Sequence, residues 1–529
     1  MLFLSALEYE SERDAKLVAT SREILWAIKM SSKASCLAIS HHERWLVALF
    51  GLVAALRVFL FAAAFPFFSN GDEDLHFDLI VRCANGKLPR TFDVLTEKTL
   101  DYIGVFASPE FLQTPENFPD GKFPAPLWKQ PHQVAAPVIE ATKDAWKNEI
   151  NWEASQPPLY YVVAAIWWDA GKFFGLRGIQ SLYWIRFLNA LLMSILVWLG
   201  FTSARTVSPE CPNLRIGVSL LLAFIPQDVF YVLSNDVLSP ICFGIVFVCL
   251  LKWFSKPPTV TLGAITGLAI AAAYLTKFSN APLLVVAIVA VLAAVFLPPR
   301  RPTARPIAAL LVITLCAGIP IAIWMLWCRA NFGDITGSTT KMVILDWTRK
   351  PFRAWFDHPI FSFRGLWVFW SELLARFWRG ELMWHNRELS LSFADNFYAI
   401  TSLIFVSMAF VGIWLGPTRL KFELKALTFA GLAFLSAVAF LLMLSIMFDF
   451  GRCAFPSRAR PFFTSGRLIS GALVPFALLY TYGVLDLVRR VAPGFPAWIM
   501  LALIAALASS FEIAVKHSVF ASEHNWFHL

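Results

Sequence analysis

The sequence predicts an all-α polytopic membrane protein with about eleven transmembrane helices. Of its 529 residues, 58% are hydrophobic and only 15% are charged, which is too little charge to cover a soluble core of this length. Eleven separate stretches each hold about 20 mostly apolar residues, the length that a helix needs to cross a bilayer. The net charge of +9 arises largely in short loops between these stretches, a pattern of membrane topology and not of nucleic-acid binding.

The predicted spans are separated by short polar turns or by two much longer loops. They cover residues 45–67, 184–204, 214–233, 236–254, 259–276, 279–297, 306–328, 397–416, 425–448, 466–487 and 495–515. A further stretch, 157–174 ("PPLYYVVAAIWWDAGKFF"), is ambiguous because Asp169 and Lys172 interrupt it after a short apolar run.

Charge decides how this further stretch is placed. If 157–174 lies on the membrane surface, five short loops fall on the side of the N-terminal tail and carry most of the loop arginines and lysines, as the positive-inside rule requires. If it spanned, all of these residues would lie outside. We therefore predict an interfacial helix with Trp167 and Trp168 at headgroup level. The basic residues are Arg205, Arg215, Lys252, Lys256, Arg300, Arg301, Arg305, Arg419, Lys421, Lys425, Arg489 and Arg490.

This topology divides the chain into a cytoplasmic tail, two transmembrane regions and two large outer loops. The tail is 1–44, with Met30 as an alternative start. The N-terminal module is 45–328 and includes the outer loop 68–183. The second outer loop is 329–396, the C-terminal helices are 397–515, and 516–529 is an outer tail. The second loop contains the amphipathic stretch "FWSELLARFWRGELMWHN", expected on the outer membrane face. Cys83 and Cys453 both fall outside, so a disulfide between them is one expectation.

Polar residues gather on the outer side of this topology. Asp72, Glu73, Asp74 and His76 follow the first span in "SNGDEDLHF". Four further segments contribute Gln156 and Tyr160, Asn235 and Asp236, Lys277, and Arg467. Charges at membrane depth are costly and usually have a partner or a task. Each has a plainer explanation: solvated loop acids, turn chemistry at Asn235–Asp236, a snorkelling Lys277, a structural His76. Their occurrence on one face favours a shared site.

Over residues 45 to 490 these segments resemble the glycosyltransferase C (GT-C) superfamily of integral membrane enzymes. "DEDLHF" is similar to the acidic run of protein O-mannosyltransferase-like enzymes. "QPPLYYVVAAIWW", "YWIRFLNALL" and "PQDVFYVLSNDVLSP" resemble its interfacial helix, the next span and a segment with a second acid. "SGRLISGALVP" is similar to a signature of an uncharacterised bacterial branch of that superfamily, with Leu468 where the branch usually has Tyr.

The resemblance implies an enzyme that moves a hexose or pentose from a polyprenyl-phosphate carrier to a glycan, lipid or protein acceptor outside the cytoplasm, in the bacterial inner membrane. Asp72 or Glu73 would deprotonate the acceptor, with Asp72 favoured because the superfamily most often uses the first acid of the pair. Arg467 and Lys277 would bind the donor phosphate. Displacement would invert the anomeric centre. The residues expected to orient the substrate are His76, Asp236, Asn235, Gln156 and Tyr160.

The metal requirement and the class of activity stay open at this point. Asp236 either orients the acceptor or, with Asp72, holds a divalent cation; no other cofactor is expected. A transporter or flippase would show repeated halves and charges near the bilayer midplane, which the sequence does not show. A glycan polymerase or ligase would share the loops and arginines but not the acidic pair. A purely structural subunit would leave the outer acids unexplained.

Overall fold

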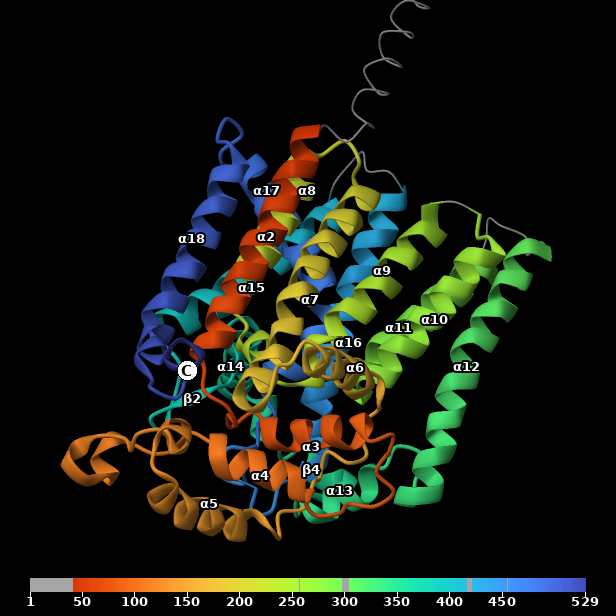
Figure 1. Ribbon diagram of the computed structural model, residues 1–529. Helices are drawn as coiled ribbons and strands as arrows, with labels where there is room; N and C mark the ends of the chain where they lie inside the picture. The colour runs from red at the N-terminus through yellow and green to blue at the C-terminus, as the bar shows by residue number, and fades with distance from the viewer. Residues whose placement is uncertain (1–40, 256, 297–303, 416–420, 454) are drawn as a thin grey trace, which may run out of the picture.

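The computed structural model describes residues 41–255, 257–296, 304–415, 421–453 and 455–529, which fold into a bundle of long helices (Figure 1). Within these residues, nine helical segments are long and apolar enough to cross a membrane. The long helices are α2 (His41–Ala64), α7 (Gly178–Val207), α9 (Ser239–Ser255), α11 (Ala281–Phe296), α12 (Ala304–Phe332), α15 (Ser392–Leu415), α16 (Lys421–Met447), α17 (Leu473–Val491) and α18 (Ala497–Lys516).

Two further apolar helices fall within predicted spans but are not among these nine segments, α8 (Pro212–Phe224) and α10 (Val260–Thr276). Helices α9 and α11 are counted because a 3₁₀ turn precedes each of them, which lengthens the segments to Asn235–Ser255 and Phe278–Phe296. At 1.5 Å per residue, α8 is only about 20 Å long. The prediction of one helix over 214–233 is therefore wrong. Pro226 has no N–H to continue the helical ladder, and the chain turns into the 3₁₀ helix η5 (Asp228–Tyr231). The all-α membrane architecture itself is confirmed, whereas eleven full-length spans are not.

Both large loops lie at one end of the bundle, as Figure 1 shows. Helix α2 begins at the opposite end, and α18 ends beside the loops. We call the end that carries the large loops the loop end. The first 40 residues of the predicted tail lie outside the described residues. The loop helices are α3 (Glu73–Ala84), α4 (Glu97–Phe106), α5 (His132–Trp146), α6 (Leu159–Phe173), α13 (Ser338–Ile344) and α14 (Phe363–Arg379).

Two short two-stranded sheets lie at the loop end, and one of them pairs segments that are far apart in the sequence. Strand β1 (Thr348–Arg349) pairs antiparallel with β4 (Phe448–Asp449), which follows α16 directly. Strands β2 (Met383–Trp384) and β3 (Arg387–Glu388) form a hairpin whose turn residues, His385 and Asn386, have positive φ of 51° and 57°. Two successive left-handed residues are what a two-residue hairpin turn requires.

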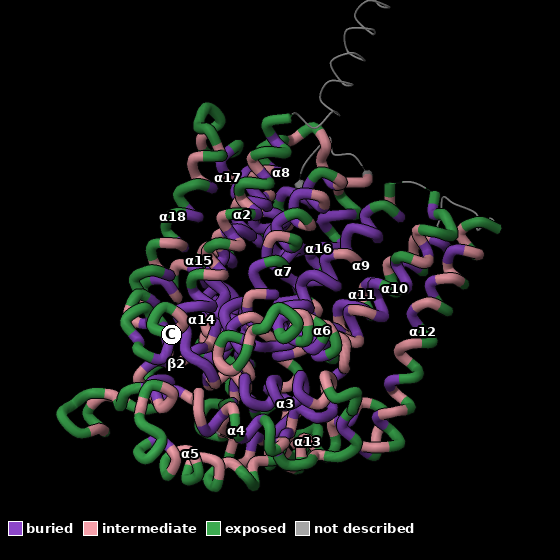
Figure 2. The backbone as a smooth tube through the Cα atoms, in the orientation of Figure 1, coloured by how far each residue is buried: buried purple, intermediate pink, exposed green. Residues whose placement is uncertain are grey.

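Burial follows the expected pattern of a membrane bundle (Figure 2). Helices α9 and α17 are mostly buried, whereas α12 exposes much of its apolar surface. The predicted interfacial helix corresponds to α6, which buries Trp168 and exposes Ile166 and Phe173. Its 15 residues are about 22 Å long, too short to span alone.

The predicted disulfide is wrong for the described part of the chain. The seven cysteines there are all free thiols. Cys83 packs on α3 against the hydrophobic core, while the Cys453 thiol donates to the carbonyl of Phe455.

Candidate functional site

The two adjacent acids that follow the first span have different roles in the structure. Glu73 is fully buried and forms a two-pronged ion pair with Arg186 of α7, with N–O distances of 2.7 and 2.6 Å. Its carboxylate also accepts the backbone N–H groups of Ser69 and Leu233 at 3.0 and 2.9 Å. Both oxygens of Glu73 are therefore occupied by fixed partners, so this residue is an anchor and the predicted base role does not fit it.

Asp72 faces away from that anchor because its backbone is in the left-handed region, with φ 61° and ψ 27°. This conformation is unusual for a residue other than glycine, and Asp is among the residues that tolerate it best. It places the Asp72 carboxylate against Arg467, whose Nη2 donates to it at 2.5 Å. Nη1 of Arg467 donates to the carbonyl of Gly71 at 3.0 Å. The predicted base and the predicted phosphate ligand thus bind each other.

Arg467 lies in the 3₁₀ helix η10 (Gly466–Ala472), just before α17. Its backbone N–H and the Ser465 hydroxyl donate to the carboxylate of Glu381, at 3.3 and 2.8 Å. The side chains of Asp72 and Arg467 keep 22% and 25% of their surface exposed. A ligand can therefore reach this ion pair, in contrast to the sealed pair of Glu73 and Arg186.

A second cation–carboxylate pair joins Lys277 to Asp236, and both residues are buried. The other carboxylate oxygen of Asp236 accepts the Ser234 hydroxyl at 3.0 Å. The neighbouring Asn235 amide donates to the side-chain carbonyl of Gln156 at 3.2 Å and to the backbone of Thr276. Gln156 precedes α6, so its hydrogen bond with Asn235 connects the predicted interfacial helix to the turn before α9.

His76 is buried on α3, with Nδ1 2.8 Å from the hydroxyl of Tyr161. Burial lowers the pKa of His76 to about 4, and the positive charges of Lys277 and Arg467 act in the same direction. The ring is therefore neutral at physiological pH. Burial raises the pKa of Asp74 to about 7, and the negative charge of Asp72 contributes. These shifts place His76 and Asp74 within electrostatic reach of the Asp72–Arg467 pair.

Several polar atoms around these pairs are buried without a hydrogen-bond partner among the described residues. They are Ser69 Oγ, Glu153 Oε2, Tyr160 Oη, Asn235 Oδ1 and Arg467 Nε. Buried polar groups are normally satisfied, so these atoms have hydrogen-bonding capacity that a polar ligand could use.

The structure brings together all the segments that the sequence analysis singled out, and adds residues that it missed. Arg186 was visible only as a charge inside an apolar stretch. Glu381 and the ion pair of Glu153 with Lys341, at 2.7 Å, gave no sequence signal beyond their charge. Within the described chain, no three His, Cys, Asp or Glu side chains are placed to hold a metal ion. The carboxylates of Asp72 and Asp236 bind Arg467 and Lys277 instead.

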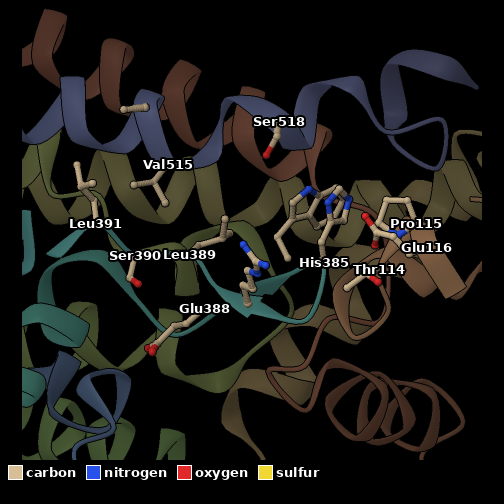
Figure 3. Close-up of a pocket in the computed structure, with 13 residues that line it drawn as sticks. Thr114, Pro115, Glu116, His385, Glu388, Leu389, Ser390, Leu391, Val515 and Ser518 are labelled. Carbon is tan, nitrogen blue, oxygen red and sulfur yellow. The ribbon is translucent and has the colours of Figure 1, made fainter. Parts of the chain in front are cut away.

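A separate cavity of about 510 Å³ lies where α18 meets the β2–β3 hairpin (Figure 3). Figure 3 shows Val515 and Leu391 on one side of it and His385 and Glu116 on the other. None of its lining residues belongs to the Asp72–Arg467 or Lys277–Asp236 pairs, so this cavity is distinct from the cluster.

The apolar helical bundle, with its polar site at the loop end, defines a polytopic integral membrane protein. Residues 56–455 match the family described as "Predicted membrane protein (DUF2142)", and the chain belongs to that family. A comparison with curated proteins gave no match.

Among solved structures, the fold is similar to ArnT from Cupriavidus metallidurans bound to undecaprenyl phosphate, with a TM-score of 0.45 and 11% identity. It is also similar to the Archaeoglobus fulgidus oligosaccharyltransferase in complex with zinc and sulfate, with a TM-score of 0.35 and 12% identity. These alignments cover 89% and 88% of this chain, but only 64% and 53% of those chains. These similarities concern the fold alone.

Proposed function

We propose that this protein is a glycosyltransferase that moves a sugar from a polyprenyl-phosphate carrier to an acceptor at the loop end of the bundle. The observation that carries the proposal is the arrangement of two cations, Arg467 and Lys277, each held by a carboxylate and surrounded by buried polar atoms without partners. Cations of this kind suit a phosphate. An adjacent carboxylate suits the deprotonation of a hydroxyl.

The proposed reaction is a single displacement. Asp72 takes the proton of the acceptor hydroxyl while that oxygen forms a bond to the anomeric carbon of the sugar. The bond from the anomeric carbon to the phosphate oxygen breaks, and polyprenyl phosphate leaves with the electron pair. Arg467 and Lys277 stabilise the negative charge of the leaving phosphate. Attack opposite the phosphate inverts the anomeric configuration.

The resting ion pair adds a condition to this mechanism. Arg467 holds Asp72 until the donor phosphate takes its place at the guanidinium. Only then is the Asp72 carboxylate available as a base. Glu73 cannot replace it because both of its oxygens are bound in a fully buried position.

The test is sugar transfer in proteoliposomes, with polyprenyl phosphate carrying a radiolabelled hexose or pentose and a membrane extract as acceptor. Asp72→Asn keeps the shape but not the basicity, and should slow transfer by about a hundredfold or more. Arg467→Lys, which loses the two-pronged geometry, should weaken donor use. The matched control is Asp120→Asn, at an exposed position in the first loop, and should transfer normally. Transfer by Asp72→Asn at the wild-type rate, or no transfer by wild type from either sugar, would contradict the proposal.

A transporter is the second candidate, and one observation favours it. Arg57 in α2, which is partly buried, forms an ion pair at 2.8 Å with the buried Glu512 of α18, and Lys516 and Tyr231 also contact Glu512. Ionisable groups inside a bundle often mark a transport path. Here, however, Lys516 also donates to the backbone carbonyls of Pro226 and Arg379 near the loop end. These contacts connect α18 to the loops by fixed hydrogen bonds, and they favour a structural role for the charged residues over a transport path. Uptake of a substrate by proteoliposomes without sugar transfer would favour the transporter.

A further inference from the structure

The segment Thr348–Leu366 of the second large loop exposes an unusual number of aromatic side chains. Phe352, Phe356, Phe361 and Phe363 have relative exposures of 65%, 63%, 58% and 90%. The ring of Phe356 lies 5.4 Å from that of Phe352 and 6.1 Å from that of Phe361, measured between centroids. A contiguous exposed apolar surface of this kind normally marks an interaction site.

The same segment lies at the level where a membrane-spanning helix ends. Strand β1 pairs with β4, which follows α16 without a break. The backbone N–H of Lys350 donates to the carbonyl of Met447, the last residue of α16, at 2.9 Å. The indole of Trp355 donates to the carbonyl of Lys350 at 3.1 Å. The exposed rings are thereby tied to the loop-end boundary of the apolar bundle.

Positive charge accompanies the rings. Arg349, Lys350, Arg353 and Arg364 lie in this segment with one acid, Asp357. None of the four has a carboxylate within ion-pair distance among the residues that the structure describes. The three arginines are also exposed, while Lys350 is half-buried.

The arginines of the neighbouring loop are different. Arg452, Arg458 and Arg460 are each paired with a carboxylate. The aromatic segment therefore carries more unpaired positive charge than this neighbouring loop does.

We propose that Thr348–Leu366, the aromatic–basic patch, binds the headgroup region of a membrane leaflet that contains anionic lipids. Aromatic rings at the end of a span insert at headgroup depth, where their apolar bodies leave water. Arginine and lysine side chains near an anionic surface add electrostatic attraction. The combination fits a lipid surface better than a soluble partner, because the rings lie beside the end of α16.

This contact has a consequence for the polar site. The patch leads directly into α14, and the residues after α14 include Glu381, whose carboxylate holds the backbone N–H of Arg467. Binding of the patch to lipid therefore fixes how deep in the membrane α14 and the following Glu381 lie, and Glu381 positions Arg467. Attachment of the patch to the membrane does not depend on glycosyl transfer.

The test places an environment-sensitive fluorescent amino acid at position 356 of the full chain in nanodiscs. One set of nanodiscs contains phosphatidylcholine alone, and the other also contains phosphatidylglycerol. Emission from position 356 should shift to the blue relative to the same label at position 120, and more so with phosphatidylglycerol. Arg353→Gln with Arg364→Gln should remove that lipid dependence. The matched control, Lys122→Gln with Lys129→Gln at exposed positions in the first loop, should retain it.

Two results would overturn the proposal. The first is emission at position 356 that matches position 120 in both nanodiscs. The second is a blue shift that appears only after a soluble polyanionic glycan is added, which would assign the surface to glycan binding. Hydrogen exchange of the unlabelled wild-type protein provides an independent measurement, since amides of residues 352–363 should exchange more slowly when phosphatidylglycerol is present.

Discussion

Arg186→Met tests whether Glu73 is an anchor. The guanidinium of Arg186 is fully buried, and each of its five N–H groups has an acceptor. Two go to Glu73, and three go to the carbonyls of Ala62, Phe65 and Pro66. The carbonyl of Ala62 needs this donor because the residue four positions later is Pro66, which has no N–H. Arg186 therefore completes the end of α2 as well as neutralising Glu73.

The expected magnitude follows from what the substitution leaves behind. Methionine fills much of the volume but leaves the Glu73 carboxylate buried without its cation. Removing one partner of a buried ion pair costs about 3–5 kcal/mol. The added substitution Glu73→Gln removes the uncompensated charge, so the double variant should be more stable than Arg186→Met alone. Such a recovery would not occur if the two residues acted independently.

The assay is thermal unfolding of the purified protein in nanodiscs, followed by tryptophan fluorescence. The matched control is Arg458→Met, which breaks the exposed pair with Asp449 and should change the unfolding temperature little, because an exposed ion pair contributes little to stability. Arg186→Met should unfold at a clearly lower temperature than this control. Equal unfolding temperatures for the two variants would refute the anchor role and reopen Glu73 as a catalytic candidate.

Two further predictions concern pH and topology. The folded state keeps a proton on Asp74 up to about pH 7, whereas the unfolded chain releases it near the ordinary pKa of 3.8. Stability should therefore fall by up to about 4 kcal/mol as pH rises from 4 to 7 and then level off. Asp74→Asn should remove this slope in thermal unfolding at pH 5 and 8; an unchanged slope would refute the assignment. For topology, a membrane-impermeant thiol reagent applied to intact cells should label Asp120→Cys but not Lys252→Cys, and labelling of Lys252→Cys would reverse the predicted orientation.

Much of the architecture could be predicted because the bilayer imposes a length and a polarity on each span. The stretch at 214–233 shows the limit of that argument. Its composition satisfies the apolar requirement throughout, but Pro226 ends the helix, and Asp228 then accepts the backbone N–H of Leu382 from the second large loop. A hydropathy window averages over both features, so it cannot separate a short helix from a continuous span.

The site was predicted by position more successfully than by role. The topology placed Asp72, Lys277 and Arg467 at one end of the bundle, and the structure brings them together. The predicted topology could not separate the roles of Asp72 and Glu73. The distinction depends on a left-handed backbone at Asp72 and on Arg186, which lies 113 positions after Glu73. A charge inside an apolar stretch needs a partner, so Arg186 itself carried a signal, but nothing in the sequence said which acid it would bind.

The resting pair of Asp72 and Arg467 leads to one more prediction, because an internal carboxylate competes with the donor phosphate for the same guanidinium. Asp72→Asn removes the competing charge but leaves Arg467 in place. Polyprenyl phosphate without sugar should therefore bind Asp72→Asn more tightly than wild type, by roughly fivefold if the pair contributes about 1 kcal/mol. Arg467→Ala should bind it more weakly. Both affinities can be measured by titrating the lipid into nanodiscs.

A direct role of Asp72 in holding the donor predicts the opposite sign. If Asp72 contacted the donor phosphate through a bound cation, Asp72→Asn would weaken binding of polyprenyl phosphate. Weaker binding by both variants would therefore contradict the competition, even if Asp72→Asn also abolishes transfer. Tighter binding together with lost transfer separates the two functions of the ion pair. Arg467 then binds the phosphate, and the Asp72 carboxylate that it releases accepts the acceptor's proton.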